Sequence, residues 1–144
     1  MEDYQAAFIG RHIDTETLCQ SGRKVAAMHF GGVTIECLLK AMILASLPQG
    51  ATQEWMTDSN NPGHTITNPG HNYIEALKRH NRLRSRIDNF QEVRKWLDEV
   101  ENPISQNFID MRYSGIEPDD ASYKRWLKAY QSLKGWLQKQ ATQL

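Results

Sequence analysis

The sequence predicts an all-α fold, a four- to five-helix up-and-down bundle built around one fully apolar helix at about residues 23–47. Residues 25–47 are almost unbroken apolar or small, and a helix that is apolar on every side has to be buried. The alternation of apolar and polar residues that is typical of half-buried strands is nearly absent from the sequence. Several other segments repeat apolar residues at helical spacing. At 144 residues, the chain is expected to form a single domain over 1–144.

The apolar helix is long enough to span a bilayer, so lipid is the alternative to a protein interior. Glu36 and Lys40 lie near its middle, where each charge would be costly in hydrocarbon. They stand at i, i+4 in the order that favours an ion pair within one helix. The N-terminal MEDYQAAF also lacks the basic start and long apolar stretch of a signal peptide. We therefore expect a buried core helix and no membrane partner.

Composition narrows the class of protein further. Cys19 and Cys37 are the only cysteines, and Cys37 lies inside the apolar helix, so a disulfide framework is not expected. A reducing cytoplasm fits this usage best. Lysine plus arginine and aspartate plus glutamate both number 17, which gives a net charge of zero. Bulk charge therefore does not predict a general polyanion binder, although local basic patches stay open.

Local sequence signals predict the helices and the loop that surround the apolar helix. A first helix is expected over 3–20, before a Ser-Gly pair, and the apolar helix should stop before Pro48. Residues 48–71 are expected to form a long irregular loop. The loop holds two copies of Asn-Pro-Gly-His, ending at His64 and His71, which suit type II turns. A metal clip between these histidines is the alternative, but without nearby cysteines or clustered carboxylates we expect turns and no metal site.

Three more helices are expected after the loop. One runs over about 72–87, and the next begins near Asn89, where Asn89 and Glu92 resemble a capping box, and ends at Asn102-Pro103. Pro118 followed by two aspartates suits the start of the last helix, because carboxylates are favourable at that end. The apolar stripe of this last helix comprises Tyr123, Trp126, Leu127, Tyr130, Leu133 and Leu137.

Three segments of the sequence share a family pattern. Residues 29–41 read HFGGVTIECLLKA, with small residues before a Glu-Cys pair and a Leu and a Lys one turn later. Gly70-His71-Asn72 then opens a helix, and Met111-Arg112-Tyr113 precedes the last one. Together these resemble the HEPN domains of bacteria and archaea over about residues 11–137. The resemblance implies a bundle of four to five helices that commonly forms a homodimer. It also implies a place in toxin–antitoxin modules, often beside a minimal nucleotidyltransferase, or in phage defence.

The same resemblance implies a test for catalysis. Many HEPN domains are metal-independent ribonucleases that use an Arg, four to six residues and a His near the start of the last long helix. The last histidine here is His80, so the motif is absent from its usual place. Arg23 and His29 have the spacing and are the candidate catalytic pair. However, the six-residue step between them turns through about 240° on an ideal helix, away from a shared face. We therefore expect binding rather than catalysis.

A candidate polar centre consists of Glu36, Lys40, Arg112 and Tyr113. It could face a nucleotide or RNA. The more common arrangement is a buried structural ion pair, with Arg112 as a third member. His29 lies two turns before Glu36 and could act as a base, although a core histidine bonded to a backbone or carboxylate oxygen is more common.

A basic run supplies the candidate nucleic-acid face, which comprises Lys78, Arg79, Arg82 and Arg86. On an unbroken helix these side chains lie close together, as phosphate contacts require. An ordinary solvated face beside acidic neighbours is the alternative. Gly31-Gly32 is not a phosphate loop, since no strand precedes it, and we expect it to allow the close approach of a neighbouring helix. No cofactor is predicted.

The sequence therefore predicts a HEPN-like module that acts as a nucleotide- or RNA-associated interaction partner in a prokaryotic toxin–antitoxin or defence setting. The expected partners are a second copy of the chain, a nucleotidyltransferase protein, and RNA or a nucleotide. One alternative is a metal-independent ribonuclease that uses Arg23 and His29. Another is a purely structural dimer that binds a second protein.

Overall fold

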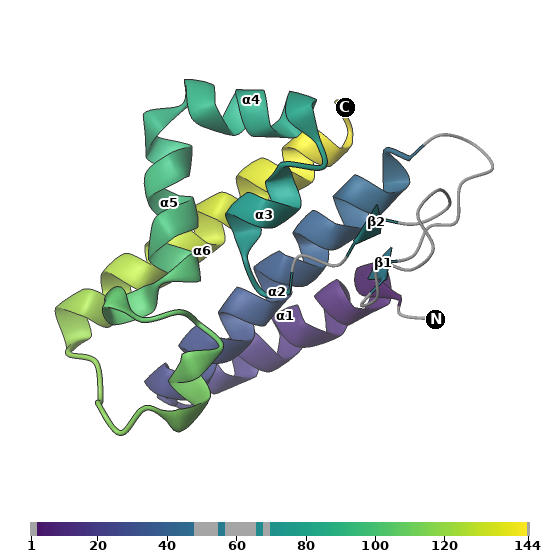
Figure 1. Ribbon diagram of the computed structural model, residues 1–144. Coiled ribbons are helices and arrows are strands. Elements are labelled where there is room, and N and C mark those ends of the chain that lie inside the picture. The colour runs from purple at the N-terminus through teal and green to yellow at the C-terminus, as the bar shows by residue number, and fades with distance from the viewer. Residues whose placement is uncertain (1–2, 48–54, 57–65, 68–69, 144) are drawn as a thin grey trace.

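The computed structural model describes residues 3–47, 55–56, 66–67 and 70–143. Within these ranges the all-α prediction is confirmed, because six α-helices and two 3-10 helices carry the fold beside two strands of two residues each. Helices α1 (Tyr4–Gln20) and α2 (Lys24–Ala45) form an antiparallel hairpin (Figure 1). Asp3 caps α1 by accepting a hydrogen bond from the backbone N–H of Ala6 at 3.0 Å.

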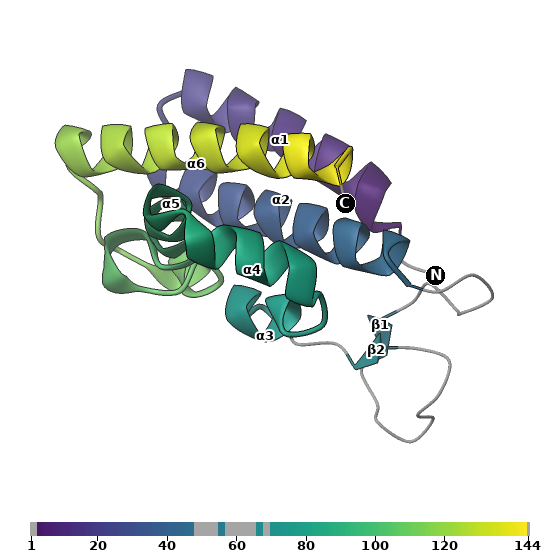
Figure 2. The ribbon, with the colours of Figure 1, turned by 90° about the horizontal axis from the view of Figure 1, so that it is seen from above.

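Helix α2 contacts α1, α3, α5 and α6. Figure 2 shows it between α1 and α6 on one side and α3, α4 and α5 on the other. Among the described helices it alone is long and apolar enough to cross a membrane, and 78% of its most apolar window is buried inside the protein. Burial of this kind satisfies a helix that has no polar face, because neighbouring helices cover each side.

Gly31 and Gly32 let aromatic side chains approach the backbone of α2. A Cβ atom at Gly31 would overlap the ring of Trp126, and one at Gly32 would overlap Phe108. Trp126 and Phe108 are both fully buried. The expected close approach at this pair is therefore confirmed, with Trp126 supplied by α6 and Phe108 by the segment between α5 and α6.

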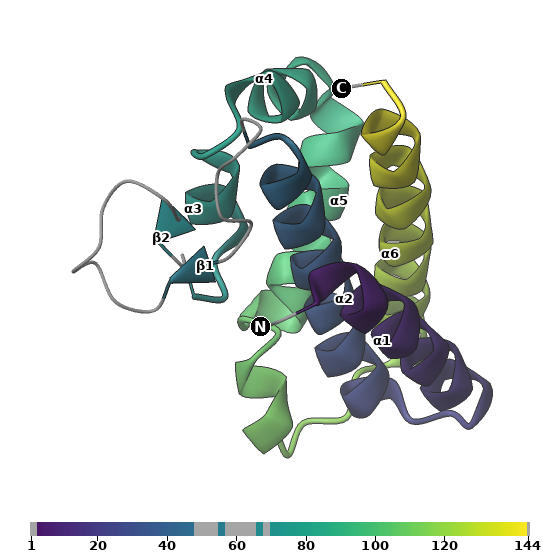
Figure 3. The same ribbon diagram turned by 90° about the vertical axis from the view of Figure 1, so that its right-hand side faces the viewer.

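Two short strands lie between α2 and α3 (Figure 3). Strands β1 (Trp55–Met56) and β2 (Ile66–Thr67) pair in parallel, so the prediction of a wholly irregular loop over 48–71 is wrong at these residues. The Trp55 side chain is buried, and its indole N–H points at the carbonyl oxygen of Lys40, 3.4 Å away. The rest of the predicted loop up to residue 69 lies outside the described residues.

The predicted helix over 72–87 is broken into α3 (Tyr73–Leu77) and α4 (Asn81–Asn89). The break arises because His80 caps α4, with its Nδ1 accepting a hydrogen bond from the N–H of Leu83 at 3.2 Å. Figure 1 shows α4 and α5 crossing the direction of α2 and α6, so the up-and-down description fails for this part of the chain.

The break at His80 predicts an acid-sensitive fold. Burial lowers the pKa of His80 below its ordinary value of 6.5, and the nearby Arg82 and Arg86 charges lower it further. The unfolded chain then binds this proton more readily than the folded protein, so stability is present above about pH 6.5 and is lost as the pH falls through the folded pKa. Urea melts should show the free energy of unfolding declining from about pH 7 to about pH 5.

His80→Asn provides the comparison for this pH effect. Asparagine keeps an oxygen that can cap α4 but does not titrate, so the decline should be shallower in the variant. Burial also lowers the pKa of His12, so part of the slope remains in either protein. A slope identical to that of the wild type would contradict the role given to His80.

Helix α5 (Gln91–Glu101) ends where predicted but begins differently. Asn89 closes α4, and Phe90 stands at the cap of α5 without a side-chain hydrogen bond, so the predicted capping box with Glu92 is wrong. Two 3-10 helices follow, η1 (Pro103–Ser105) and η2 (Asp110–Tyr113). Helix α6 (Asp120–Ala141) starts as predicted. The buried members of its stripe are Trp126, Tyr130, Leu133 and Leu137.

Candidate functional site

A cavity of about 660 Å³ lies between the start of α2 and the segment that joins η2 to α6. We call it the basic cleft, because Arg23, Lys24 and Arg112 line it. Its other polar lining residues are His29, Ser114 and Glu117. The two candidate catalytic residues thus share one cavity with Arg112, a residue from a distant part of the sequence.

Arg23 lies outside the helical part of the backbone. It stands at the cap of α2 with φ −87° and ψ 76°, and its side chain is exposed. The expectation that Arg23 and His29 cannot share a face assumed that both belong to an ideal helix. That expectation is wrong here, because both residues line the basic cleft.

His29 has one defined tautomer when its ring is neutral. Its Nδ1 lies 3.0 Å from the carbonyl oxygen of Phe108, and a carbonyl can only accept, so Nδ1 carries the hydrogen and donates. Nε2 is therefore the unprotonated nitrogen, and it has no hydrogen-bond partner within the part of the chain that the structure describes. The common arrangement of a histidine bonded to a backbone oxygen is present, and it leaves a basic nitrogen in a residue that lines the cleft.

Arg112 and Tyr113 belong to η2 and are both exposed. The Nε–H of Arg112 donates to the carbonyl oxygen of Ile109 at 2.9 Å, and its guanidinium lies 4.9 Å from the centre of the Tyr113 ring. Neither residue forms an ion pair with Glu36 among the described residues. The four-residue polar centre predicted from the sequence is therefore divided between two separate places.

Lys24 and Glu117 make the cleft less positive than its name suggests. The Nζ of Lys24 lies 2.7 Å from a carboxylate oxygen of Asp120, and this hydrogen bond raises the pKa of Lys24 above its ordinary value. Lys24 is thus paired with Asp120 at the start of α6, and Glu117 adds one carboxylate to the lining of the cleft. The cations available to a ligand are the guanidinium groups of Arg23 and Arg112.

The other part of the predicted centre is a buried ion pair on α2. The Nζ of Lys40 lies 3.8 Å from Glu36, and only 4% of the Lys40 side chain and 10% of the Glu36 side chain are exposed. The third member is His71 rather than Arg112, since its Nδ1 lies 2.6 Å from the same oxygen of Glu36. Sequence reasoning missed this contact because no local spacing joins His71 to the middle of α2. The other histidine of the suggested metal clip, His64, lies outside the described residues.

The candidate nucleic-acid face is not continuous. Because the helix breaks before His80, Lys78 and Arg79 lie between α3 and α4 rather than on α4. Both contact Glu75 of α3. Arg86 instead donates to the side chain of Gln140 on α6 at 2.8 Å. Arg82 stays exposed and lines a different cavity, near the end of α2. The single helix face predicted over these four residues is therefore not formed, although Arg82 and Arg86 stay one turn apart on α4.

No protein-family model matches the chain, and neither a curated protein nor a solved structure matches it. The basic cleft is the place where Arg23, His29 and Arg112 come together, and Tyr113 lies next to Arg112, so the candidate function is argued from this geometry.

Proposed function

We propose that this chain is a HEPN-like module that binds the phosphate groups of RNA or of a nucleotide in the basic cleft. The observation that supports this function is the convergence of Arg23 and Arg112 with His29 on one cavity. Guanidinium groups suit phosphate because their planar donors can make two parallel hydrogen bonds to its oxygens. Neither guanidinium is taken up by an ion pair within the described ranges.

Single-stranded RNA is the favoured ligand because of Tyr113. Its side chain belongs to a residue that is 79% exposed, next to an arginine that lines the cleft. Unpaired bases stack on exposed aromatic rings and on guanidinium planes, whereas bases inside a duplex cannot. Tyr113 and Arg112 together offer both kinds of surface beside the phosphate site.

Binding is tested with a short fluorescein-labelled single-stranded RNA, followed by fluorescence anisotropy. Arg23→Gln and Arg112→Gln should each weaken binding by about tenfold, because each removes a charged hydrogen bond to phosphate. The salt dependence should fall by about one unit of slope in each variant. Arg125→Gln is the control, since Arg125 is an exposed arginine that pairs with Glu99 outside the cleft. Equal binding by all four proteins would contradict the proposal.

Ribonuclease activity is the second candidate function, favoured by the tautomer of His29. In this function Nε2 would remove the proton of a ribose 2′-hydroxyl, so that O2′ attacks the adjacent phosphorus. The P–O5′ bond then breaks, the 5′-oxygen takes a proton from water, and a 2′,3′-cyclic phosphate remains. Positively charged arginines would stabilise the charge that develops on the phosphate oxygens.

Cleavage is tested on the same RNA in the presence of a chelator, with the products analysed by mass spectrometry. His29→Ala should lower the rate by about 10²–10⁴-fold and leave the affinity for RNA nearly unchanged, because the loss removes a base and not a cation. An RNA with a 2′-deoxyribose at the cleavage position should be resistant. Cleavage that persists in His29→Ala would exclude the ribonuclease function and leave the binding proposal in place.

The wider setting stays a prediction from the resemblance. It comprises a homodimer in the cytoplasm, a toxin–antitoxin or defence role and a nucleotidyltransferase partner. A purely structural role in binding another protein makes the opposite prediction for the basic cleft, because it requires no affinity for RNA or nucleotides. The anisotropy measurement therefore separates the two.

A further inference from the structure

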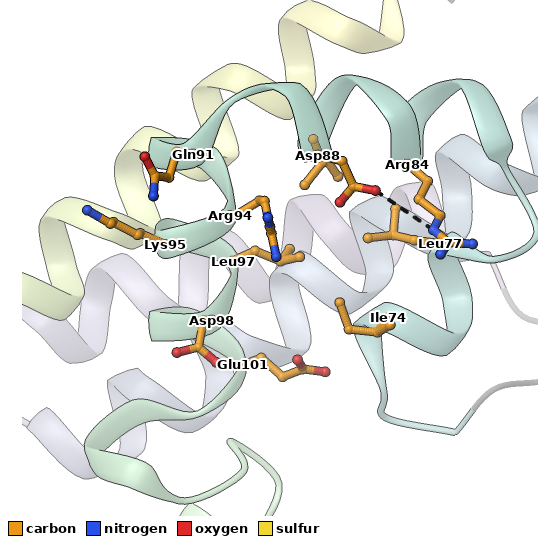
Figure 4. Close-up of a pocket in the computed structure, with 11 residues that line it drawn as sticks. Ile74, Leu77, Arg84, Asp88, Gln91, Arg94, Lys95, Leu97, Asp98 and Glu101 are labelled. Carbon is orange, nitrogen blue, oxygen red and sulfur yellow. Dashed lines mark ion pairs between the residues drawn. The ribbon is translucent and has the colours of Figure 1, made fainter.

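A second cavity, of about 840 Å³, lies between α3, α4 and α5 (Figure 4). We call it the α3–α5 groove. Its apolar lining consists of Leu77, Ile87 and Leu97, which are almost fully buried, and of Ile74, which is 49% exposed. The apolar surface that the rest of the described chain leaves uncovered in this groove is therefore mainly that of Ile74.

Charged residues lie in groups of opposite sign along α5 in this groove. Arg94 and Lys95 stand toward the start of the helix, whereas Asp98 and Glu101 stand toward its end (Figure 4). Within the described ranges none of these four residues forms an ion pair. The ion pair among the lining residues joins Arg84 to Asp88, one turn apart on α4, at 4.0 Å. A ligand with a cation over the acidic end would find an uncompensated partner there.

Glu101 is the buried carboxylate of this groove, and we expect it to be the group that pairs with a cation. It is only 8% exposed, and its Oε2 accepts a hydrogen bond from the backbone N–H of Tyr73 at 2.7 Å, which fixes the carboxylate at the start of α3. Its Oε1 has no hydrogen-bond partner among the described residues. Burial raises the pKa of this carboxyl, and the charge of Asp98 raises it further. A bound cation would relieve both effects.

We propose that the α3–α5 groove docks a peptide segment of a partner protein, in which an aliphatic side chain packs beside Ile74 and Leu97 and an adjacent Arg or Lys pairs with Glu101. The length of the groove favours a peptide over a small cation. Gln91 and Glu101 both line it, and this part of α5 spans about 15 Å at the rise of an α-helix. A phosphate group is disfavoured near Glu101, because the carboxylates of Asp98 and Glu101 both line that end of the groove.

The probes are the capped dipeptides acetyl-Leu-Arg-amide and acetyl-Leu-Gln-amide, titrated into the full chain while backbone amide shifts are followed by NMR. The amides of residues that line the groove should shift, and the arginine peptide should bind about tenfold more tightly, as expected for a hydrogen bond to a charged group. Equal binding of both peptides, or shifts confined to other surfaces, would overturn the proposal.

Glu101→Gln tests the anchor and keeps the hydrogen bond at the start of α3, because the amide oxygen still accepts from the N–H of Tyr73. The preference for the arginine peptide should vanish in this variant. Glu99→Gln is the matched control, since Glu99 lies on the same helix but pairs with Arg125 outside the groove, and it should keep the preference. Asp98→Asn changes an exposed position and should reduce the preference for the arginine peptide. It replaces Glu101→Gln in the test if that variant does not fold.

Two further ligands distinguish the occupants of the groove. Agmatine carries the guanidinium without the leucine, so it should bind more weakly than the arginine peptide. Agmatine binding as tight as the peptide would overturn the peptide proposal in favour of a small-cation site. A single-stranded RNA that shifts the groove amides would overturn it as well, since nucleic acid would then be the ligand.

Discussion

Replacing Gly32 with alanine should lower the free energy of unfolding by about 3 kcal/mol, the upper end of the usual cost of overpacking a core. The added methyl group would overlap Cβ and Cγ of Phe108, whose side chain is fully buried. Phe108 has little room to move, because its ring packs against Tyr73 with centroids 5.3 Å apart and its N–H donates to the carbonyl oxygen of Glu101 at 2.9 Å. Urea melts at neutral pH measure the change.

Gly10→Ala is the matched control for this substitution. Gly10 lies inside α1, and a Cβ atom added there meets nothing within 4 Å. Alanine should therefore stabilise the protein by about 0.5–1 kcal/mol, because it restricts the unfolded chain and favours the helix. If Gly32→Ala were as harmless as Gly10→Ala, the packing of Phe108 on α2 would be wrong. The position of His29, which donates to Phe108, would then be in doubt too.

Replacing Glu36 with alanine should cost about 3–5 kcal/mol, because it removes the carboxylate that neutralises a buried lysine. The side chain of Lys40 is only 4% exposed, so water cannot take the place of Glu36. The same substitution leaves His71 without its partner, although this side chain is 54% exposed and can be solvated. Urea melts with an unchanged m-value would assign the loss to stability alone.

His71→Ala separates the two partners of Glu36. The His71 side chain is 54% exposed, so its contact with Glu36 contributes little and this variant should lose no more than about 1 kcal/mol. A loss below about 0.5 kcal/mol in Glu36→Ala would show that the buried pair does not hold the core together. A larger loss in His71→Ala than in Glu36→Ala would place the main contact at the start of α3 instead.

The fold could be predicted where the signal is local. The start of α6 follows from Pro118 and the two aspartates, and the end of α5 from Asn102-Pro103. The break before α4 could not, since apolar residues on both sides keep a helical period. Histidine is also not among the residues that usually cap a helix. Asn89 and Glu92 show the converse, a local capping pattern that the packed structure does not use.

The candidate site could likewise be predicted where the signal is local and not where it depends on tertiary contacts. The spacing of Arg23 and His29 could be found in the sequence, but the angle between them depended on where α2 begins. Arg112 reaches the cleft because Phe108 packs on Gly32 and anchors the connecting segment, a tertiary contact that no local pattern contains. The pairing of His71 with Glu36 is equally non-local.

The hairpin of α1 and α2 has a consequence for how the chain reaches its native state. These helices are consecutive, joined by a turn of three residues, and share the most extensive helix–helix contact among the described elements. Closing so short a turn costs little entropy, so this pair can assemble while the rest of the chain is still being translated. Helix α6 follows much later in the sequence and contributes Trp126, which packs on Gly31. Docking of α6, which joins segments far apart in the sequence, is therefore expected to follow the assembly of the α1–α2 hairpin.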